Sequence, residues 1–380
     1  MSPSAHVFST SFGDCGVAWS ERGIRALQLP EASSAVLLKK LRGRREALAL
    51  VEPPPPVADL VRRVQAHLGG QTDRRGFRDV ELDLEGVTPF IREVYQTARA
   101  TGPGRTTTYA DVARSCGSPG AARAVGRAMA RNPVPIIVPC HRVMASDGLG
   151  GFSAHGGLAA KLRLLTVEGT DLAPLARLGV AAVGRADPAL RPLIRRAERF
   201  PLAEAARRRI DPFSALVESI VHQQVSMKAG AAIFRRLLEV TGTPPAPDAV
   251  LAASVDRLRG AGLSERKASY VRDLAHRVVR GELPLDRVRR LDDEAVIELL
   301  TRVKGIGRWS AEMFLMFHLG RLDVLAVDDL GLRKGAREVY RLRRLPDAKR
   351  LRRLARPWIP FRSIGSWYLW RALDAGGLSA

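Results

Sequence analysis

The sequence of 380 residues contains few cysteines and no long apolar run. Its three cysteines, Cys15, Cys116 and Cys140, all lie in the first half, at spacings that suit neither a disulfide framework nor a metal cage. No stretch approaches the ~18 apolar residues that span a membrane, and the first ten residues lack the basic segment and apolar core of a signal peptide. We therefore expect a cytoplasmic protein with no metal, no cofactor and no membrane partner.

Acidic residues are scarce relative to basic ones. The chain has 39 Asp and Glu against 61 Lys and Arg, which gives a formal net charge of +22. Because neutralising phosphates releases counterions, such an excess favours a nucleic-acid partner; an arginine content set by codon bias is the alternative. A chain of this length can form two or three domains with separate cores.

The front of the chain, 1–85, predicts a small α/β unit. Residues from about 7 to 29 look like a β-hairpin, with partial alternation over 12–19 and 24–29, and a helix is expected over 35–50. Four consecutive prolines at 53–56 then indicate a stiff, extended spacer. Apolar residues at helical spacing predict another helix over 57–68. This unit shows no catalytic constellation of its own.

Two short helices around a tight turn follow, and their spacing resembles a helix-turn-helix. The first begins after Thr108, and the second covers about 121–131. In the second helix Arg123, Arg127 and Arg131 recur every four residues and so share a face. A solvated charged face is the ordinary explanation, but the charge of the whole chain favours contact with DNA.

Residues 139–143, Pro-Cys-His-Arg-Val, are the strongest chemical feature of the first half. A thiol becomes a good nucleophile only as the thiolate, which a neighbouring imidazole can generate. Cys140 follows an apolar run and precedes a glycine-rich loop at 148–151. An inert buried cysteine is the alternative, and the five residues alone do not decide between the two.

The motifs around Cys140 resemble the O6-alkylguanine-DNA alkyltransferases. The resemblance rests on Tyr109, on 121–126 (Ala-Ala-Arg-Ala-Val-Gly), on 132–135 (Asn-Pro-Val-Pro) and on 139–143, in that order. It covers about 7–170. An ordered set of motifs of this kind is much more specific than a lone Cys-His pair.

The resemblance implies a reaction and a role for each of several residues. Such proteins flip an alkylated guanine out of duplex DNA, and Arg123 would fill the gap. Cys140 would attack the alkyl carbon, His141 would take the thiol proton through a water, and Glu168 would orient the imidazole. Tyr109 would assist the leaving guanine. Because the thioether product is stable, each molecule would act once.

Other positions carry smaller roles or departures from the family. The resemblance implies that Asn132 fixes the loop of the active site. Phe152 stands where the family often has Tyr, which removes a hydrogen bond to the base. Ala154 and His155 look like a small expansion of the substrate loop. Glu168 alternatively reads as a surface carboxylate at a helix end.

The second half is helical by pattern after a linker expected at 172–184. Lys304-Gly305-Ile306-Gly307 lies between two predicted helices, and its backbone N–H groups could receive a phosphate at a helix N-terminus. A lone Gly-x-Gly is usually a simple turn. An apolar run at 324–327 then leads to Asp328 and Asp329, one of which can cap the next helix.

Together with Gln223, Gln224 and late tryptophans, this set resembles the helix-hairpin-helix DNA glycosylases, specifically the 3-methyladenine branch, over about 178–376. The resemblance implies that Asp329 stabilises the charge that develops on the sugar, and we expect Asp328 to be the cap.

Trp309 stands where lyase-competent relatives carry lysine, which predicts a monofunctional enzyme. Trp309 and Trp370 would bind the cationic purine, with core aromatics as the alternative. Gln224 would wedge into the base stack, with Gln223 beside it.

The sequence thus predicts a multidomain protein with an α/β part and an all-α part. The expected pieces are an α/β subdomain (1–85), a helix-turn-helix alkyltransferase domain (86–171), the linker (172–184) and an all-helical glycosylase domain (185–380). The expected partner is double-stranded DNA with alkylated bases, bound by a monomer that is nucleoid-associated if bacterial.

A non-catalytic lesion sensor or DNA-binding regulator is the alternative function, although such sensors lack the reactive cysteine. Alkylation-response regulators carry a four-cysteine zinc module that this chain cannot build. A basic nucleoid protein would leave Cys140 and Asp329 unexplained.

Overall fold

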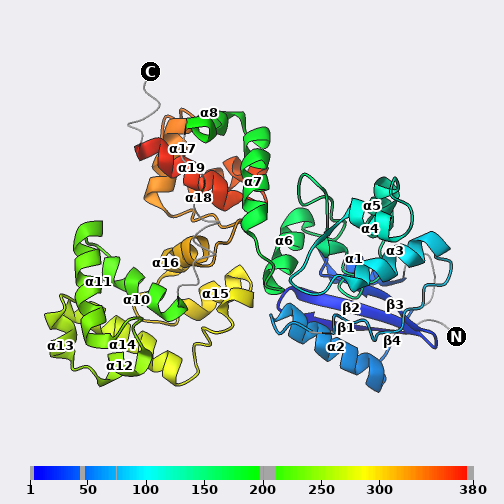
Figure 1. Cartoon of the computed structure of the whole chain (residues 1–380), viewed down its shortest axis with the longest axis horizontal. Coiled ribbons are helices and arrows are strands. Elements are labelled where there is room, and N and C mark those ends of the chain that lie inside the picture. The colour runs from blue at the N-terminus through cyan, green and yellow to red at the C-terminus, as the bar shows by residue number, and fades with distance from the viewer. Residues whose placement is uncertain (1–3, 43–47, 74, 197–199, 201–210, 375–380) are drawn as a thin grey trace. The chain divides into compact units, whose positions relative to one another are not determined.

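The computed structural model describes residues 4–42, 48–73, 75–196, 200 and 211–374 and divides the chain into two compact units. The first comprises Met1–Asp171 with Arg290–Asp292, and the second comprises Leu172–Arg289 with Asp293–Ala380. The described part of the first unit combines a small mixed sheet with helices, and that of the second is helical (Figure 1). The predicted fold class is therefore confirmed.

The sheet of the first unit has four strands in the order β3-β2-β1-β4. Strand β2 pairs antiparallel with both β1 and β3, whereas β4 pairs parallel with β1. The bounds are β1 Ser4–Thr10, β2 Gly13–Ser20, β3 Gly23–Gln28 and β4 Ala49–Leu50. The region predicted as a hairpin contains β2–β3, but its start belongs to β1, which was not predicted as a separate strand.

Period-2 alternation assigns the two faces of this sheet to different partners. Ala18 packs in a small cluster with helix α1, Ser34–Arg42, while Val17 belongs to the main core with helix α2, Pro55–Leu68. The helix predicted over 35–50 was too long: α1 ends at Arg42, 43–47 lie outside the described residues, and Ala49 starts β4.

The predicted proline spacer was also wrong in its second half. Pro54 is the N-cap residue of α2, and Pro55 and Pro56 form the first turn of the helix. Proline is tolerated there because a first-turn N–H has no partner within the helix, and its fixed φ already suits the helix.

The rest of the first unit builds the helix-turn-helix and the cysteine loop. A capping box between Thr108 and Asp111 starts α4, and a parallel pair of two-residue strands joins the segment before α4 to the segment after the cysteine. The elements are α3 Pro89–Ala100, β5 Thr107–Thr108, α4 Tyr109–Ser115, α5 Ala122–Ala130, β6 Val143–Met144 and α6 Gly157–Val167.

Helices from both ends of the second unit pack together. Helix α7, Ala173–Ala186, contacts α19, Arg362–Asp374, which in turn contacts α17, Leu330–Val339. Asp187 accepts hydrogen bonds from the Tyr340 hydroxyl and, at 2.8 Å, from Trp358 Nε1. The linker predicted at 172–184 is therefore mostly helix α7, whose apolar residues are buried in this cluster.

A second group of helices lies around α14 in the same unit (Figure 1). Its members are α10 Pro212–His222, α11 Met227–Thr241, α12 Pro247–Ala252, α13 Val255–Gly260 and α14 Glu265–Val279, while α15 Asp293–Leu300 packs against the next helix, α16 Arg308–Met313. Helix α16 continues as a π-helical turn over Phe314–His318. The unit also contains α8 Arg191–Arg196 and α18 Ala348–Leu354.

Candidate active sites

Cys140 begins a short 3₁₀ turn, Cys140–Arg142, after the buried run at 136–138. Ile136 has φ +75, which is uncommon for a β-branched residue and requires support from its surroundings. Asn132 supplies it: Asn132 Nδ2 donates to the Val138 carbonyl at 2.7 Å, and Asn132 Oδ1 accepts from Val134 N at 3.0 Å. The amide side chain therefore holds together the turn that delivers the cysteine.

The Cys140 side chain lines a cavity of about 270 Å³. Since an apolar cavity of about 150 Å³ can hold benzene, this cavity has room for a two-ring base. Its walls come from the start of α4, from α5 and from the loop after the cysteine. The other lining residues are Tyr109, Gly126, Met129, Ala130, Gly151, Phe152 and Ser153.

One wall of this cavity depends on Gly150 and Lys161. Gly150 has φ +71, and a Cβ there would lie 2.9 Å from Tyr109 Cε2 and 3.0 Å from its hydroxyl, so the loop needs glycine. The buried Lys161 Nζ donates to the carbonyls of Val143 at 2.7 Å and Leu149 at 2.5 Å, and burial lowers its pKa to about 8. Lys161 was not predicted from the sequence, although a lone lysine within the apolar pattern of α6 was a signal.

His141 is arranged to accept a proton. His141 Nε2 lies 2.8 Å from Glu168 Oε1, and its Nδ1 has no hydrogen-bond partner among the described residues. If Nε2 carries the hydrogen for Glu168, Nδ1 is left as a base. Burial lowers the pKa of His141 despite the nearby Glu168 charge, and burial raises the pKa of the Cys140 thiol.

Glu168 receives more hydrogen bonds than the sequence indicated. Arg142 donates from Nε at 2.9 Å and from Nη2 at 2.7 Å, and His67 Nε2 lies 3.0 Å from Oε1. Burial alone would raise the pKa of Glu168, but His141, His67 and Arg142 together hold it well below its usual value. The carboxylate is buried, so it is not a surface residue at a helix end.

Two members of this network were not predicted. Arg142 belongs to the quoted motif, but nothing in the sequence paired it with Glu168. His67 lies in α2, within the part of the chain predicted to lack any catalytic constellation. His67 nevertheless contacts the same carboxylate as His141, so this part of the chain reaches the Glu168 network through one residue.

The second helix of the helix-turn-helix presents arginines to the surface. Arg123 and Arg127 are exposed on α5 and have no ion pair among the described residues, whereas Val125, Ala128 and Met129 are buried on its other face. Tyr109, at the start of α4, lines the cavity, and burial raises the pKa of its hydroxyl.

The second site centres on Asp329. This residue, not Asp328, is the N-cap of α17, so the predicted cap was wrong: Asp329 Oδ1 accepts from Leu332 N, at 2.5 Å. The same carboxylate accepts from Trp370 Nε1 at 2.9 Å on Oδ1 and from Trp309 Nε1 at 2.8 Å on Oδ2. Asp328 is exposed. The structure thus brings together Asp329, Trp309 and Trp370.

Aromatic surface surrounds this carboxylate. The Trp309 side chain is 48% exposed and Phe317 is 42% exposed, which is unusual for large rings. Phe317 stacks on Trp370, with ring centroids 5.8 Å apart and an interplanar angle of 29°. Phe317 was missed because its position in the apolar helix pattern is that of an ordinary core residue. Two indoles in contact with one carboxylate are not plain core aromatics.

The glycine hairpin lies between α15 and α16. Gly305 has φ +79, and a Cβ there would lie 2.1 Å from the Tyr270 ring, so no side chain fits. Gln223 Nε2 donates to the Gly305 carbonyl at 2.9 Å, and Gly307 is the N-cap of α16. Gln224 is exposed in the left-handed region, with φ +56. Gln223 therefore braces the hairpin, and Gln224 faces solvent.

Comparison with known proteins divides the chain in the same way. Residues 89–170 match the model of the 6-O-methylguanine DNA methyltransferase DNA binding domain, and 217–361 match the HhH-GPD superfamily of base excision DNA repair proteins. DNA-3-methyladenine glycosylase 1 of Schizosaccharomyces pombe is 35% identical over 164 residues, which are 42% of this chain and 72% of that protein.

Similar proteins to the first half include a methylated-DNA–protein-cysteine methyltransferase of Methanothermobacter thermautotrophicus. It is 34% identical over 161 residues, which are 42% of this chain and 81% of that protein. The crystal structure of Mycobacterium tuberculosis OGT in complex with DNA is 32% identical, covers 44% of this chain and 92% of that chain, and has a TM-score of 0.36. Among the described residues, no helix is both long and apolar enough to span a membrane.

Proposed function

Because the chain belongs to the methylated-DNA–protein-cysteine methyltransferase family in its first half and to the HhH-GPD family of 3-methyladenine DNA glycosylases in its second, we propose that it repairs alkylated DNA by two chemistries. Cys140 takes alkyl groups from O6-alkylguanine, once per molecule. Asp329 supports repeated hydrolytic excision of N-alkylated purines. The partner is double-stranded DNA with alkylated bases.

The first reaction follows from the contacts of Cys140. Because burial raises the pKa of this thiol, it is protonated at neutral pH, and its proton must go to a base as it attacks. His141 Nδ1 is that base, reached through a water. The sulfur then bonds to the alkyl carbon, and the carbon–O6 bond breaks with its electron pair on guanine. Tyr109, on the cavity wall, hydrogen-bonds to the departing base.

DNA binding by the first half rests on the exposed face of α5. A base must leave the stack to reach a buried cysteine, at a cost of a few kcal/mol that is smallest for a damaged base. Arg123 fills the gap that the base leaves, and Arg127 contacts phosphate from the same face. Both side chains are exposed, as this role requires.

The second reaction follows from the indoles around Asp329. Positive charge develops on the sugar as the N-glycosidic bond breaks, and a fixed carboxylate stabilises it or activates water. Trp309 and Trp370 hold Asp329 by their N–H groups and offer electron-rich faces to a cationic purine. With tryptophan at position 309, no Schiff base can form there, so the enzyme is monofunctional.

The observation that carries the proposal is the pairing of each reactive group with a matched partner: Cys140 with a base-sized cavity and a free His141 nitrogen, and Asp329 with two indoles. The test is incubation of the purified protein with duplex DNA containing O6-methylguanine, and separately with DNA containing 3-methyladenine. We expect a singly methylated Cys140 peptide by mass spectrometry and free 3-methyladenine by chromatography. Methyl on another residue, or no released base, would contradict the corresponding half.

A further inference from the structure

The buried His67 is 101 residues from Glu168 in the sequence and contacts it directly. It lies in the last turn of α2, its side chain is fully buried, and its Nε2 is 3.0 Å from Glu168 Oε1. His141 Nε2 is hydrogen-bonded to the same atom, Oε1. Two imidazoles from distant segments of the first unit therefore share one carboxylate oxygen.

The hydrogen bond on the other side of the ring fixes its tautomer. The backbone N–H of Asp73 donates to His67 Nδ1 at 3.2 Å. Since Nδ1 accepts a hydrogen bond, it carries no proton, and Nε2 must carry the hydrogen of the ring. His67 is thus a neutral donor to Glu168.

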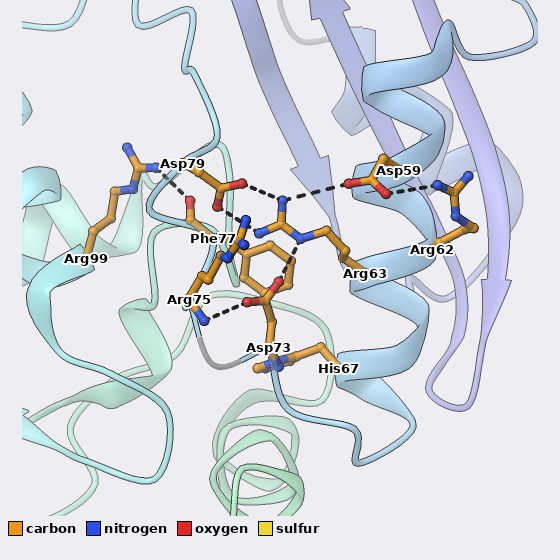
Figure 2. Close-up of polar contacts among 9 residues, drawn as sticks. All are labelled: Asp59, Arg62, Arg63, His67, Asp73, Arg75, Phe77, Asp79 and Arg99. Carbon is orange, nitrogen blue, oxygen red and sulfur yellow. Dashed lines mark hydrogen bonds and ion pairs between the residues drawn. The ribbon is translucent and has the colours of Figure 1, made fainter.

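The segment after α2 holds this ring in place. Figure 2 shows Arg63 among three carboxylates: Nε donates to Asp73 Oδ2 at 2.7 Å, the two Nη atoms bind both oxygens of Asp79 at 2.8 Å, and Nη1 lies 4.0 Å from Asp59 Oδ2. The Phe77 ring meets His67 edge to face, with centroids 5.3 Å apart. Asp73, which donates to His67, is therefore itself anchored by Arg63.

We propose that His67 is a positioning residue for alkyl transfer, which sets the place of Glu168 and limits how strongly this carboxylate attracts the proton of His141. The proposal rests on the proposed methyltransferase function of Cys140. The charged and titratable groups around the pair are Glu168 and Arg142 on one side, and Asp73 and Arg63 behind His67.

The physical consequence concerns Oε1. A hydrogen bond donated to this oxygen partly neutralises its negative charge. The hydrogen bond from His67 therefore reduces how strongly Glu168 stabilises the protonated, cationic form of His141. When the His67 donor is removed, His141 should hold a proton more strongly. As the pH falls, the neutral His141 that receives the Cys140 proton is then lost at a higher pH. The acid limb of the transfer rate therefore moves to higher pH.

The test compares His67→Met with His67→Gln. Glutamine and methionine have similar length, but only glutamine keeps an N–H donor for Glu168. In His67→Met we expect single-turnover methyl transfer roughly three- to tenfold slower at pH 7, and an acid limb roughly 0.5 to 1 pH unit higher. His67→Gln should recover most of both properties. Phe77→Leu loosens the same packing and keeps the hydrogen bond, so its acid limb should match that of the unaltered protein.

A second readout separates this proposal from the methyltransferase function itself. The ¹⁵N chemical shifts of the His141 ring report its protonation in each full-length variant without any DNA. His141 should protonate at a higher pH in His67→Met than in the unaltered protein and in His67→Gln.

The positioning role is overturned if His141 protonates at the same pH in all variants. It is also overturned if the acid limb of the transfer rate moves by the same amount in His67→Met, His67→Gln and Phe77→Leu. If the unaltered protein transfers no methyl group, the proposed function fails, and the titration still decides the role of His67.

Discussion

The two sites of this chain use a carboxylate in opposite surroundings. Glu168 is only 4% exposed and is enclosed by Arg142 and two imidazoles. Asp329 accepts hydrogen bonds from two indoles and a backbone N–H, and its neighbour Trp309 is half exposed. In the proposed function, the enclosed carboxylate acts through His141, whereas the more open one meets the substrate itself.

The difference extends to the reacting groups. Burial raises the pKa of the Cys140 thiol, so in the proposed reaction the thiol needs a partner that removes its proton, and the hydrogen bond to Glu168 orients His141 for that role. In the proposed excision, Asp329 needs only to remain fixed beside developing positive charge, and its role as the N-cap of α17 fixes it. Both sites must admit a base, but only the first depends on a proton acceptor held by a buried network.

The largest effect is expected at the nucleophile. Cys140→Ala should abolish methyl transfer to the protein completely, because no other described residue places a thiol on the cavity. The measurement is the methyl content of the intact protein after incubation with O6-methylguanine DNA. Cys116→Ala is the matched control, since Cys116 is hydrogen-bonded to Thr97 and does not line the cavity. The Cys116→Ala protein should accept one methyl group, as the unaltered protein does. A methylated Cys140→Ala protein would refute this site.

The next effect concerns the open carboxylate. Asp329→Asn should slow release of 3-methyladenine by roughly 10²- to 10³-fold, the loss typical of removing a preorganised electrostatic group. Asparagine is as good an N-cap as aspartate, but its NH2 group cannot accept from Trp309 Nε1, so the melting temperature should fall by only about a few degrees. Asp328→Asn, one residue away and exposed, serves as the control and should keep its excision rate. If Asp328→Asn alone is inactive, the wrong carboxylate has been chosen.

The aromatic surface gives a smaller effect that can be divided into two parts. Trp309→Leu removes both the ring and the N–H donor to Asp329, whereas Trp309→Phe keeps a ring and removes only the donor. Stacking on a base is worth about 1 to 3 kcal/mol, so single-turnover excision should fall roughly 5- to 100-fold in Trp309→Leu and less in Trp309→Phe. Equal rates in both variants would show that the ring face does not bind the base.

The smallest effect is expected from pH. Because burial lowers the pKa of His141, it remains a neutral base as the pH falls through about 6.5, the value of an ordinary histidine. Methyl transfer measured in single turnovers should therefore change less than about twofold between pH 7.5 and about 6.5. A fall of half or more centred near 6.5 would mean that His141 is as accessible to protons as a free side chain.

The same comparison shows which features the sequence could predict. Local motifs carry chemical type and order, so their resemblance to known families indicated Cys140, His141, Asp329 and Trp309, and the spacing of two short helices indicated the helix-turn-helix with Arg123. Contacts between distant segments leave no periodic signal. Nothing near His67 indicated that α2 reaches Glu168, and nothing near Phe317 indicated that it stacks on Trp370.

Errors of another kind came from capping and from proline. Two adjacent carboxylates, Asp328 and Asp329, are equivalent by sequence, and only the direction of the chain into α17 makes Asp329 the cap. Four prolines indicate an extended chain, but a helix can begin at the third, as α2 does at Pro55. The small residues at 172–184 suggested a linker. They form a helix instead, because their apolar face packs against α19, which lies far along the chain and could not be identified as a partner from the sequence.

The central claim is that one chain carries two independent chemistries. The most direct measurement is a single reaction on duplex DNA that contains both O6-methylguanine and 3-methyladenine, with methylated Cys140 and free base quantified together by mass spectrometry. The unaltered protein should give both products, Cys140→Ala only the free base, and Asp329→Asn only the methylated cysteine. Loss of both products in either variant would contradict this account.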